Sequence, residues 1–364
     1  MKRMLGLGSG AFVFTFLLVL GVGVDAAPGT PARAEAAVQT VAAGAGTFAL
    51  ASVSAPTVSA VSRVLPAPSE APDEPMVFSA VEDAQGGPWS PPSWFPEESR
   101  DDLWALDGMS GHAAPGDGPT VRAAAAFVYD VDAGVVLYEK HADDRRPAAS
   151  LTKVLSGLTA LSENPDLSRE ICIDPSQWPG WPGAHSYLNT GTCTTGWDLL
   201  GAALVASDNR AAFAFAPISG LPFQPFVSHM NEIAADLGMD QSSFVDPAGV
   251  DDNNLSTARD LSRAILAASL HPVLGPVASA PTWDISETRR EHSRRLFSTN
   301  RLADQENLEF LAAKTGYTDT ARYCFAAVVR TESGRRVALA VLGAPNVRTR
   351  WADVRRIVDW VEEG

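Results

Sequence analysis

Two strings in this sequence place a lysine close to a hydroxyl, the pairing that proton-transfer chemistry needs. Ser150-Leu151-Thr152-Lys153 puts an amine three residues after a serine, and Lys314-Thr315-Gly316 puts an amine directly before a threonine. Lysine is otherwise found only at positions 2 and 140, while arginine is frequent. Burial can deprotonate a lysine but not an arginine. Both strings are therefore candidates for acid–base chemistry.

Ser150 and Lys153 fall at the predicted start of a helix. Apolar residues recur there at helical spacing, at Leu151, Val154, Leu155, Leu158 and Leu161. Residues three apart share one helix face, so the Lys153 amine can approach the Ser150 hydroxyl. A buried Lys153 would be a base for Ser150 as nucleophile, and the helix N-terminus favours negative charge there. The alternative is an ordinary serine and lysine on a helix surface.

A third string, Ser207-Asp208-Asn209, follows a predicted helix at 197–206 and offers a hydroxyl and a carboxamide together. Its alternative role is a helix cap, since these residue types are preferred at helix ends. Lys314-Thr315-Gly316 lies on a predicted strand, where Gly316 would let a ligand approach the backbone closely. Each string alone is short enough to occur by chance.

The remaining pattern predicts an α+β fold. Strands are predicted at 123–129, 135–139, 311–318, 322–331 and 336–342. Helices are predicted from about residue 150, at 197–206, 225–237 and 257–270, and around a C-terminal stripe of Trp351, Val354, Val358 and Val361. Two early strands, three late strands and a largely helical insert predict one antiparallel sheet flanked by helices. The two ends of the folded part would meet in that sheet.

The three strings share the order and the elements of a known constellation, with Ser-x-x-Lys at a helix start, Ser-x-Asn in a loop and Lys-Thr-Gly on a strand. Longer strings accompany them: Pro147-Ala148-Ala149-Ser150-Leu151-Thr152-Lys153, Met230-Asn231, Leu237-Gly238-Met239, Ser256-Thr257-Ala258-Arg259-Asp260-Leu261 and Lys314-Thr315-Gly316-Tyr317-Thr318-Asp319-Thr320-Ala321. From about Ala123 onward the chain resembles the low-molecular-weight penicillin-binding D-alanyl-D-alanine carboxypeptidases and endopeptidases, relatives of the serine β-lactamases. The resemblance implies a β-lactamase/transpeptidase-like fold with a five-stranded antiparallel sheet.

The resemblance also implies an acyl-enzyme mechanism on a peptidoglycan stem peptide, with β-lactams as inhibitors. Ser150 would attack the carbonyl between two D-alanines with Lys153 as its base. By the same resemblance, Ser207 and Lys314 would pass a proton to the departing amine, and Asn209 would bind the substrate amide. The backbone N–H groups of Ser150 and Tyr317 would form the oxyanion hole. Thr315, next to Gly316, would bind the terminal carboxylate, with Arg350 or Arg348 as the cation.

A D-alanyl-D-alanine carboxypeptidase is the main prediction, and a D,D-endopeptidase that cleaves cross-links is the alternative. The string 207–212 and the chain's end soon after its last helix look more like the endopeptidase branch. A non-catalytic wall-binding module would be the alternative of another class. A class A β-lactamase is disfavoured because no Glu-x-x-x-Asn string occurs. No cofactor or metal is expected, since the six histidines show no paired spacing.

The first third of the chain has a different composition. Residues 1–26 combine Lys2 and Arg3 with an apolar run, which predicts a signal peptide or an uncleaved N-terminal membrane anchor. Residues 27–118 are rich in Ala, Pro and Ser, partly acidic and without periodicity, which predicts a disordered tether before a catalytic domain at 119–364. Trp89, Trp94, Phe95 and Trp104 are unusual in a tether, and we expect them to dock onto the folded domain or onto a partner.

Charge and cysteine content bear on partners and compartment. The formal net charge of −15 argues against nucleic acid as a partner. The predicted leader places the protein in the periplasm or the cell envelope. Cys172 and Cys193 are close in sequence and could form a disulfide in such a compartment, or remain buried thiols, while Cys324 is left over.

Overall fold

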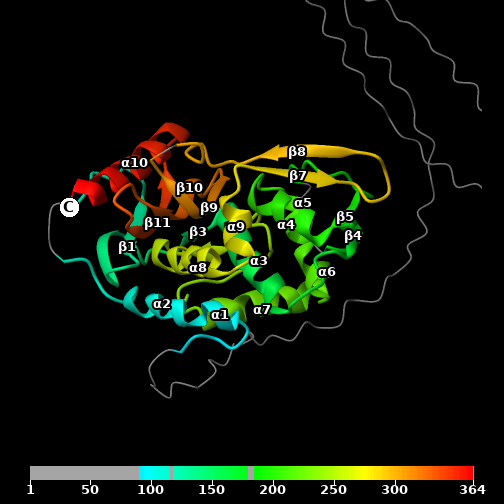
Figure 1. The fold of residues 1–364 in the computed structure, drawn as a ribbon, viewed down its shortest axis with the longest axis horizontal. Coiled ribbons are helices and arrows are strands. Elements are labelled where there is room, and N and C mark those ends of the chain that lie inside the picture. Colours follow the sequence, from blue (N-terminus) through cyan, green and yellow to red (C-terminus); the bar gives the residue numbers. More distant parts are fainter. Residues whose placement is uncertain (1–89, 115–117, 179–183, 306, 364) are drawn as a thin grey trace, which may run out of the picture. The chain divides into compact units, whose positions relative to one another are not determined.

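A computed structural model describes residues 90–114, 118–178, 184–305 and 307–363 (Figure 1). All of them belong to one unit of the chain, Asp83–Gly364. The predicted signal or anchor and the predicted tether up to residue 89 lie outside the described residues. Within the described ranges, every helix is too short or too polar to cross a membrane.

The fold is organised around the predicted five-stranded antiparallel sheet. Its strands are β1 (Ala125–Asp130), β2 (Val135–Lys140), β9 (Glu309–Thr318), β10 (Arg322–Arg330) and β11 (Arg336–Ala344). Their order is β2-β1-β11-β10-β9, so the first strand pairs with the last one, with Phe127 opposite Ala340. This arrangement confirms the expected α+β, β-lactamase/transpeptidase-like fold and leaves β9, which carries Lys314-Thr315-Gly316, at an edge.

Both faces of the sheet are covered by helices because all of its central strands are apolar on both sides. On β1, Phe127 and Tyr129 belong to one core cluster, and Val128 belongs to the other. The first cluster includes α8 (Ala258–Leu270), whereas the second includes the C-terminal helix α10 (Val347–Glu363) through its predicted apolar stripe. Figure 1 shows α8 and α10 on opposite sides of the sheet.

The segment between β2 and β9 is mainly helical, as expected. Besides α8 it contains α3 (Thr152–Ser162), α4 (Gly196–Leu204), α5 (Asn209–Phe213), α6 (Phe215–Ser219), α7 (Phe223–Asp236), α9 (Leu274–Ser279) and 3-10 turns at Ala149–Leu151 and Pro175–Gln177. Three small ribbons join β3 (Arg146–Pro147) to β6 (Leu255–Ser256), β4 (Glu170–Cys172) to β5 (Cys193–Thr195), and β7 (Thr282–Ser286) to β8 (Ser293–Phe297). The β7–β8 hairpin was not predicted, because most of its residues are exposed and carry no clear apolar alternation.

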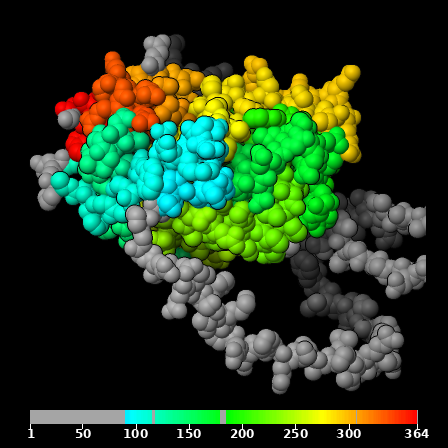
Figure 2. Space-filling model, turned by 60° about the horizontal axis from the view of Figure 1, so that its bottom comes forward, coloured from blue at the N-terminus to red at the C-terminus, as the bar shows by residue number. Residues whose placement is uncertain are grey.

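Residues just before the predicted catalytic domain are part of the folded unit. They form α1 (Glu97–Arg100), a 3-10 turn (Asp101–Trp104) and α2 (Ala105–Gly108). Phe95, Leu103, Leu106 and Met109 are buried in the main core. The boundary expected at residue 119 therefore lies too late, and Phe95 docks onto the chain's own domain. In Figure 2 these residues, in cyan, form a compact patch against later segments.

Two arginines of α8 hold this early segment in place. Arg259 Nη1 donates to the carbonyl oxygen of Met109 at 2.7 Å, and Arg263 Nη1 donates to that of Leu106 at 2.7 Å. The Leu106 carbonyl oxygen also accepts the backbone N–H of Met109 at 3.1 Å, and the two guanidinium groups add side-chain donors at the end of this short helix. α1, the 3-10 turn and α2 have four residues each, which is too short to show a helical period, so this docking was not predicted.

Candidate active site

The Ser150 hydroxyl lies at the junction between a 3-10 turn and α3. Ala149, directly before it, has a left-handed φ of 49°, an uncommon conformation for a residue with a side chain. A Cβ on Gly249, itself at φ +71°, would lie only 1.8 Å from the Ala149 carbonyl oxygen. The backbone of Gly249 therefore packs against the peptide group between Ala149 and Ser150, where a side chain would not fit.

Lys153 is fully buried, and its amine has three oxygen neighbours. Its Nζ lies 2.9 Å from Ser150 Oγ, 2.8 Å from Asn209 Oδ1 and 2.7 Å from the Ala248 carbonyl oxygen. A neutral amine has two N–H bonds and one lone pair. Since Asn209 Oδ1 and the Ala248 carbonyl can only accept, they take the two N–H bonds, and the lone pair is left for the proton of Ser150.

Burial makes this neutral form accessible. It lowers the pKa of Lys153 from 10.5 to about 7, although the charges of Asp246 and Asp208 work in the opposite direction. The amine is therefore a base of suitable strength near neutral pH, and it lies within hydrogen-bonding distance of the hydroxyl that it would activate.

The Ala248 carbonyl is held in place by a loop built around buried Asp246. One carboxylate oxygen of Asp246 accepts the backbone N–H groups of Ala248 and Gly249, both at 2.7 Å. The other accepts the N–H of Asp251 at 2.8 Å and the side-chain amide of Asn254 at 2.6 Å. The sequence analysis missed this loop, because its effect on Lys153 depends on tertiary contacts.

Ser207-Asp208-Asn209 combines the two roles that were considered for it. Asp208 is the N-cap of α5 and accepts the N–H of Ala211 at 2.9 Å. This cap orients the residues on either side of it. Asn209 contacts Lys153, whereas Ser207, at a left-handed φ of 60°, places its Oγ 2.8 Å from Lys314 Nζ. The strained backbone of Ser207 is a feature that often accompanies functional sites.

Lys314 lies on β9 and is almost completely buried. Its amine contacts Ser207 Oγ and the Thr315 carbonyl oxygen, the latter at 3.0 Å. Burial lowers the pKa of Lys314 well below its usual value, and the nearby cations Lys153 and Arg350 add to this effect. Thr315 Oγ1 lies 2.7 Å from the hydroxyl of Thr299, a site neighbour that the sequence analysis did not identify.

Six of the nine predicted site residues line one cavity of about 590 Å³. Its lining comprises Ser150, Tyr187, Ser207, Phe297, Ser298, Thr299, Arg301, Thr315, Gly316, Tyr317, Tyr323, Val347 and Arg350. Lys153, Asn209 and Lys314 lie behind this lining and contact it through Ser150 and Ser207. Of the two arginines considered for carboxylate binding, Arg350 lines the cavity and Arg348 does not.

Gly316 and Tyr317 continue the wall along β9. A Cβ at Gly316 would lie 3.2 Å from the Ala148 carbonyl oxygen, so the strand passes close to the turn that carries Ser150. The Tyr317 ring is exposed and packs at 4.5 Å, centroid to centroid, against Tyr323. Some lining residues belong to no recognisable sequence motif and were therefore not predicted: Tyr187, Phe297, Thr299 and Arg301.

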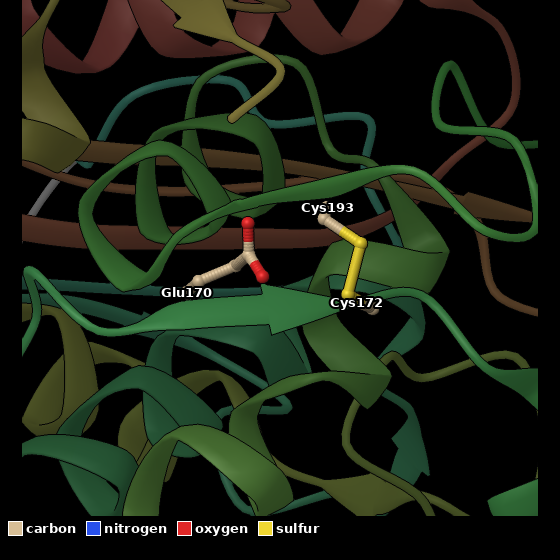
Figure 3. A group of neighbouring side chains, drawn as sticks. All are labelled: Glu170, Cys172 and Cys193. Carbon is tan, nitrogen blue, oxygen red and sulfur yellow. A yellow bond between two sulfur atoms is a disulfide. The ribbon is translucent and has the colours of Figure 1, made fainter. Parts of the chain in front are cut away.

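One group of three potential metal ligands occurs in the described part of the chain, and it lies outside this cavity. Figure 3 shows it as Glu170 beside Cys172 and Cys193. The two cysteines, opposite one another on β4 and β5, form a disulfide, so neither sulfur is available as a thiolate ligand. Glu170 accepts a hydrogen bond from Arg289 Nε at 2.9 Å. These three residues therefore stabilise the fold and do not form a metal site. The sequence left open whether Cys172 and Cys193 are bridged, and the structure shows that they are.

Comparisons with known proteins agree with this geometry. The D-alanyl-D-alanine carboxypeptidase family, peptidase family S11, matches residues 112–346. The D-alanyl-D-alanine endopeptidase of Escherichia coli K12 is 31% identical over 247 residues, which cover 68% of this chain and 79% of the relative. The D-alanyl-D-alanine carboxypeptidase DacF of Bacillus subtilis 168 is 29% identical over 250 residues, which cover 66% and 62%.

Solved structures show the same fold. A D-alanyl-D-alanine carboxypeptidase from Mycobacterium tuberculosis H37Rv superimposes with a TM-score of 0.60 at 27% identity, over 70% of this chain and 95% of the other. The Streptomyces K15 DD-transpeptidase superimposes with a TM-score of 0.62 at 24% identity, over 68% of this chain and 100% of the other. With the family match spanning more than half of its length, this chain belongs to the D-alanyl-D-alanine carboxypeptidase family of serine peptidases.

Proposed function

We propose that this protein is a serine D-alanyl-D-alanine carboxypeptidase that acts on peptidoglycan stem peptides through an acyl-enzyme on Ser150. The observation that carries the proposal is the contact between Ser150 Oγ and the buried Lys153 amine, whose two N–H bonds already have acceptors. A surface serine and lysine would not share such an environment. β-Lactams would acylate the same hydroxyl.

In the first step, Lys153 takes the proton of Ser150 as Oγ attacks the carbonyl carbon between the two D-alanines. The carbonyl oxygen becomes an oxyanion, which the backbone N–H groups of Ser150 and Tyr317 would stabilise. Donors placed at such a charge contribute about 3 kcal/mol each. Because β9 is at the edge of the sheet, its free backbone groups could bind the extended substrate peptide as an additional strand.

In the second step, the tetrahedral intermediate collapses and the amine departs with a proton. Ser207 would deliver this proton, assisted by Lys314, whose Nζ lies 2.8 Å from Ser207 Oγ. The proton that Lys153 took from Ser150 would then restore the Ser207 hydroxyl, which leaves Lys153 neutral again. Asn209 would hold the amide of the acyl half. Water then attacks the acyl-enzyme, with Lys153 again as the base, and releases the shortened peptide.

The terminal carboxylate of the substrate would bind between Thr315 and Arg350. Arg350 is buried, and its guanidinium packs 4.2 Å from the Trp351 ring centroid and 5.7 Å from that of Tyr323. Burial lowers the pKa of Arg350 to about 10, so the group remains charged at neutral pH. A fixed cation beside Thr315 supports recognition of a free carboxylate, as carboxypeptidase activity requires.

A D,D-endopeptidase that cleaves peptidoglycan cross-links is the second candidate. It is favoured by the relatives from Escherichia coli and Pseudomonas aeruginosa, which are 31% and 32% identical and are named D-alanyl-D-alanine endopeptidases. The same catalytic groups serve either reaction, so the leaving group decides between them.

Defined muropeptides analysed by mass spectrometry test the proposal. The purified protein should remove one D-alanine from pentapeptides, whereas conversion of cross-linked dimers to monomers would establish endopeptidase activity. A Ser150→Ala variant is the matched control and should form neither product. Persistent cleavage by that variant would exclude the acyl-enzyme on Ser150.

We further propose that the protein acts outside the cytoplasm, in the periplasm or cell envelope. The disulfide between Cys172 and Cys193 supports this location, because such bonds form and persist in oxidising compartments. Fractionation of cells expressing the full chain tests it, and recovery in the cytoplasm would contradict it.

A further inference from the structure

The charges around the candidate active-site cavity differ from those of the chain as a whole. The chain has 43 acidic against 28 basic residues, yet the cavity lining contains no acidic residue and two arginines, Arg301 and Arg350. Recognition of one terminal carboxylate needs one cation, which Arg350 supplies in the proposed function. Arg301 is therefore a second cation without an assigned ligand.

The residues before and after Arg301 in the chain are held in place by hydrogen bonds and by burial. Asn300 is buried, and its side-chain oxygen accepts the backbone N–H of Leu302 at 3.0 Å. Leu302 is fully buried in the core cluster beneath α10. One residue earlier, Thr299 donates its backbone N–H to the Val205 carbonyl oxygen at 3.1 Å. The exposed side chain of Arg301 is thus presented to the cavity from a rigid backbone.

Arg301 and Arg350 act on one another and lack a neutralising partner. The positive charge of Arg301 adds to burial in lowering the pKa of Arg350. Within the described residues, neither guanidinium forms an ion pair with a carboxylate, although Arg350 donates to the Cys324 carbonyl oxygen at 3.3 Å. Two adjacent cations without a counter-charge favour a ligand that brings more than one negative charge.

The position of Arg301 indicates which half of the substrate it contacts. Thr299 connects its turn to Thr315, through hydroxyl groups 2.7 Å apart. In the proposed function, Thr315 and Ser207 serve the amine half of the substrate, which departs when the tetrahedral intermediate collapses. Arg301 is therefore on the side of the leaving group.

We propose that Arg301 is a specificity-determining residue that binds a second carboxylate on the leaving amine, so that the protein prefers a leaving strand that is itself a peptide acid, as in a cross-linked dimer. This inference rests on the acyl-enzyme mechanism of the proposed function and favours its second candidate, the D,D-endopeptidase. A single D-alanine leaving group has only the carboxylate that Arg350 and Thr315 would bind.

The space beside Arg301 fits such a leaving strand. Phe297 lines the cavity with a ring that is 69% exposed, which provides an apolar contact for the aliphatic chain of a diamino acid. Phe297 and Tyr187 also line a second hollow of about 400 Å³, together with Arg294 and Arg295. This second hollow shares Tyr187 and Phe297 with the active-site cavity and adds Arg294, whereas Arg295 is paired with Asp284 at 2.7 Å.

Three peptides tested on the full chain decide the question: a cross-linked dimer, the same dimer with the leaving strand's distal carboxylates amidated, and the dimer amidated on the acyl strand instead. The wild-type protein should cleave the free dimer with roughly fivefold higher kcat/KM than the leaving-strand amide, as expected for an exposed charge pair. Arg301→Ala should reduce this ratio to about one. Arg348→Ala is the matched control, because Arg348 is exposed and does not line the cavity.

An unchanged ratio in Arg301→Ala would overturn the inference, as would a loss of preference on amidation of the acyl strand alone. Raising the salt concentration should weaken the preference of the wild type, since exposed charges are screened. Acylation by penicillin, measured in parallel, separates the two proposals. If the wild-type protein is acylated but does not cleave the dimer, or cleaves it with a ratio that does not depend on Arg301, only this inference fails. If it is neither acylated nor active on any peptide, the proposed function fails with it.

Discussion

Acylation of Ser150 should depend on pH through the protonation of Lys153. The structure lowers the pKa of this amine from 10.5 to about 7, which corresponds to roughly 5 kcal/mol of preference for the neutral form over an exposed lysine. Only the neutral amine can take the proton of Ser150. Because the pKa is lowered, the base is present above pH 7 and is lost as the pH falls through that value.

The assay is the second-order rate constant for acylation by a fluorescent penicillin between pH 5 and pH 9. The rate should be nearly constant above pH 8 and should fall about tenfold per unit below pH 7, to about 1% of its maximum at pH 5. Intrinsic tryptophan fluorescence at each pH controls for unfolding. Equal rates at pH 5.5 and pH 8, or a rate that still rises about tenfold between pH 8 and pH 9, would refute the assignment of a neutral Lys153 as the base.

Three further predictions concern the surroundings of the serine and the stability of the fold. Lys153→Arg should retain its far-UV circular dichroism but lose penicillin acylation, because a guanidinium stays protonated; normal acylation would remove Lys153 from the mechanism. Gly249→Ala should lower the free energy of unfolding in urea by more than about 3 kcal/mol, because its Cβ would lie 1.8 Å from a carbonyl oxygen. The control is Gly334→Ala, which has φ +90° but open space around it and should lower the free energy of unfolding by about 1 kcal/mol. Equal losses in the two variants would contradict this prediction. Reduction of the Cys172–Cys193 disulfide, which spans 21 residues, should cost about 3 kcal/mol in the same assay, and an unchanged urea midpoint would show that the bridge does not stabilise the fold.

The sheet and its covering helices could be predicted because their residues have strong local patterns. β10 and β11 are almost continuous apolar runs, and α10 carries apolar residues on one face only. Such patterns determine whether a segment becomes a strand or a helix before any tertiary contact forms. The same holds for α3, which was predicted from about residue 150 and begins at Thr152.

The segments that were missed owe their structure to other parts of the chain. α1 and α2 are four residues each, too short to show a period, and the end of α2 is held by Arg259 and Arg263 of α8. The strands of the β7–β8 hairpin are mostly exposed, so no alternation of apolar residues marked them.

In the candidate site, too, the residues that belong to short motifs were predicted, whereas those that act through tertiary contacts were not. Short motifs identified Ser150, Lys153, Ser207, Asn209 and Lys314, whose side chains contact one another across three separate elements. The acceptor that completes the environment of Lys153 is a backbone carbonyl, at Ala248, and any residue type could supply it. Sequence patterns do not record such contacts, so the loop around Asp246 became visible only in three dimensions.

Mass spectrometry of the intact protein after incubation with penicillin, followed by peptide mapping, tests the central claim most directly. The account predicts a single covalent adduct on the Ser150 hydroxyl, absent from Ser150→Ala. No adduct on the folded protein, or an adduct on another residue, would contradict it.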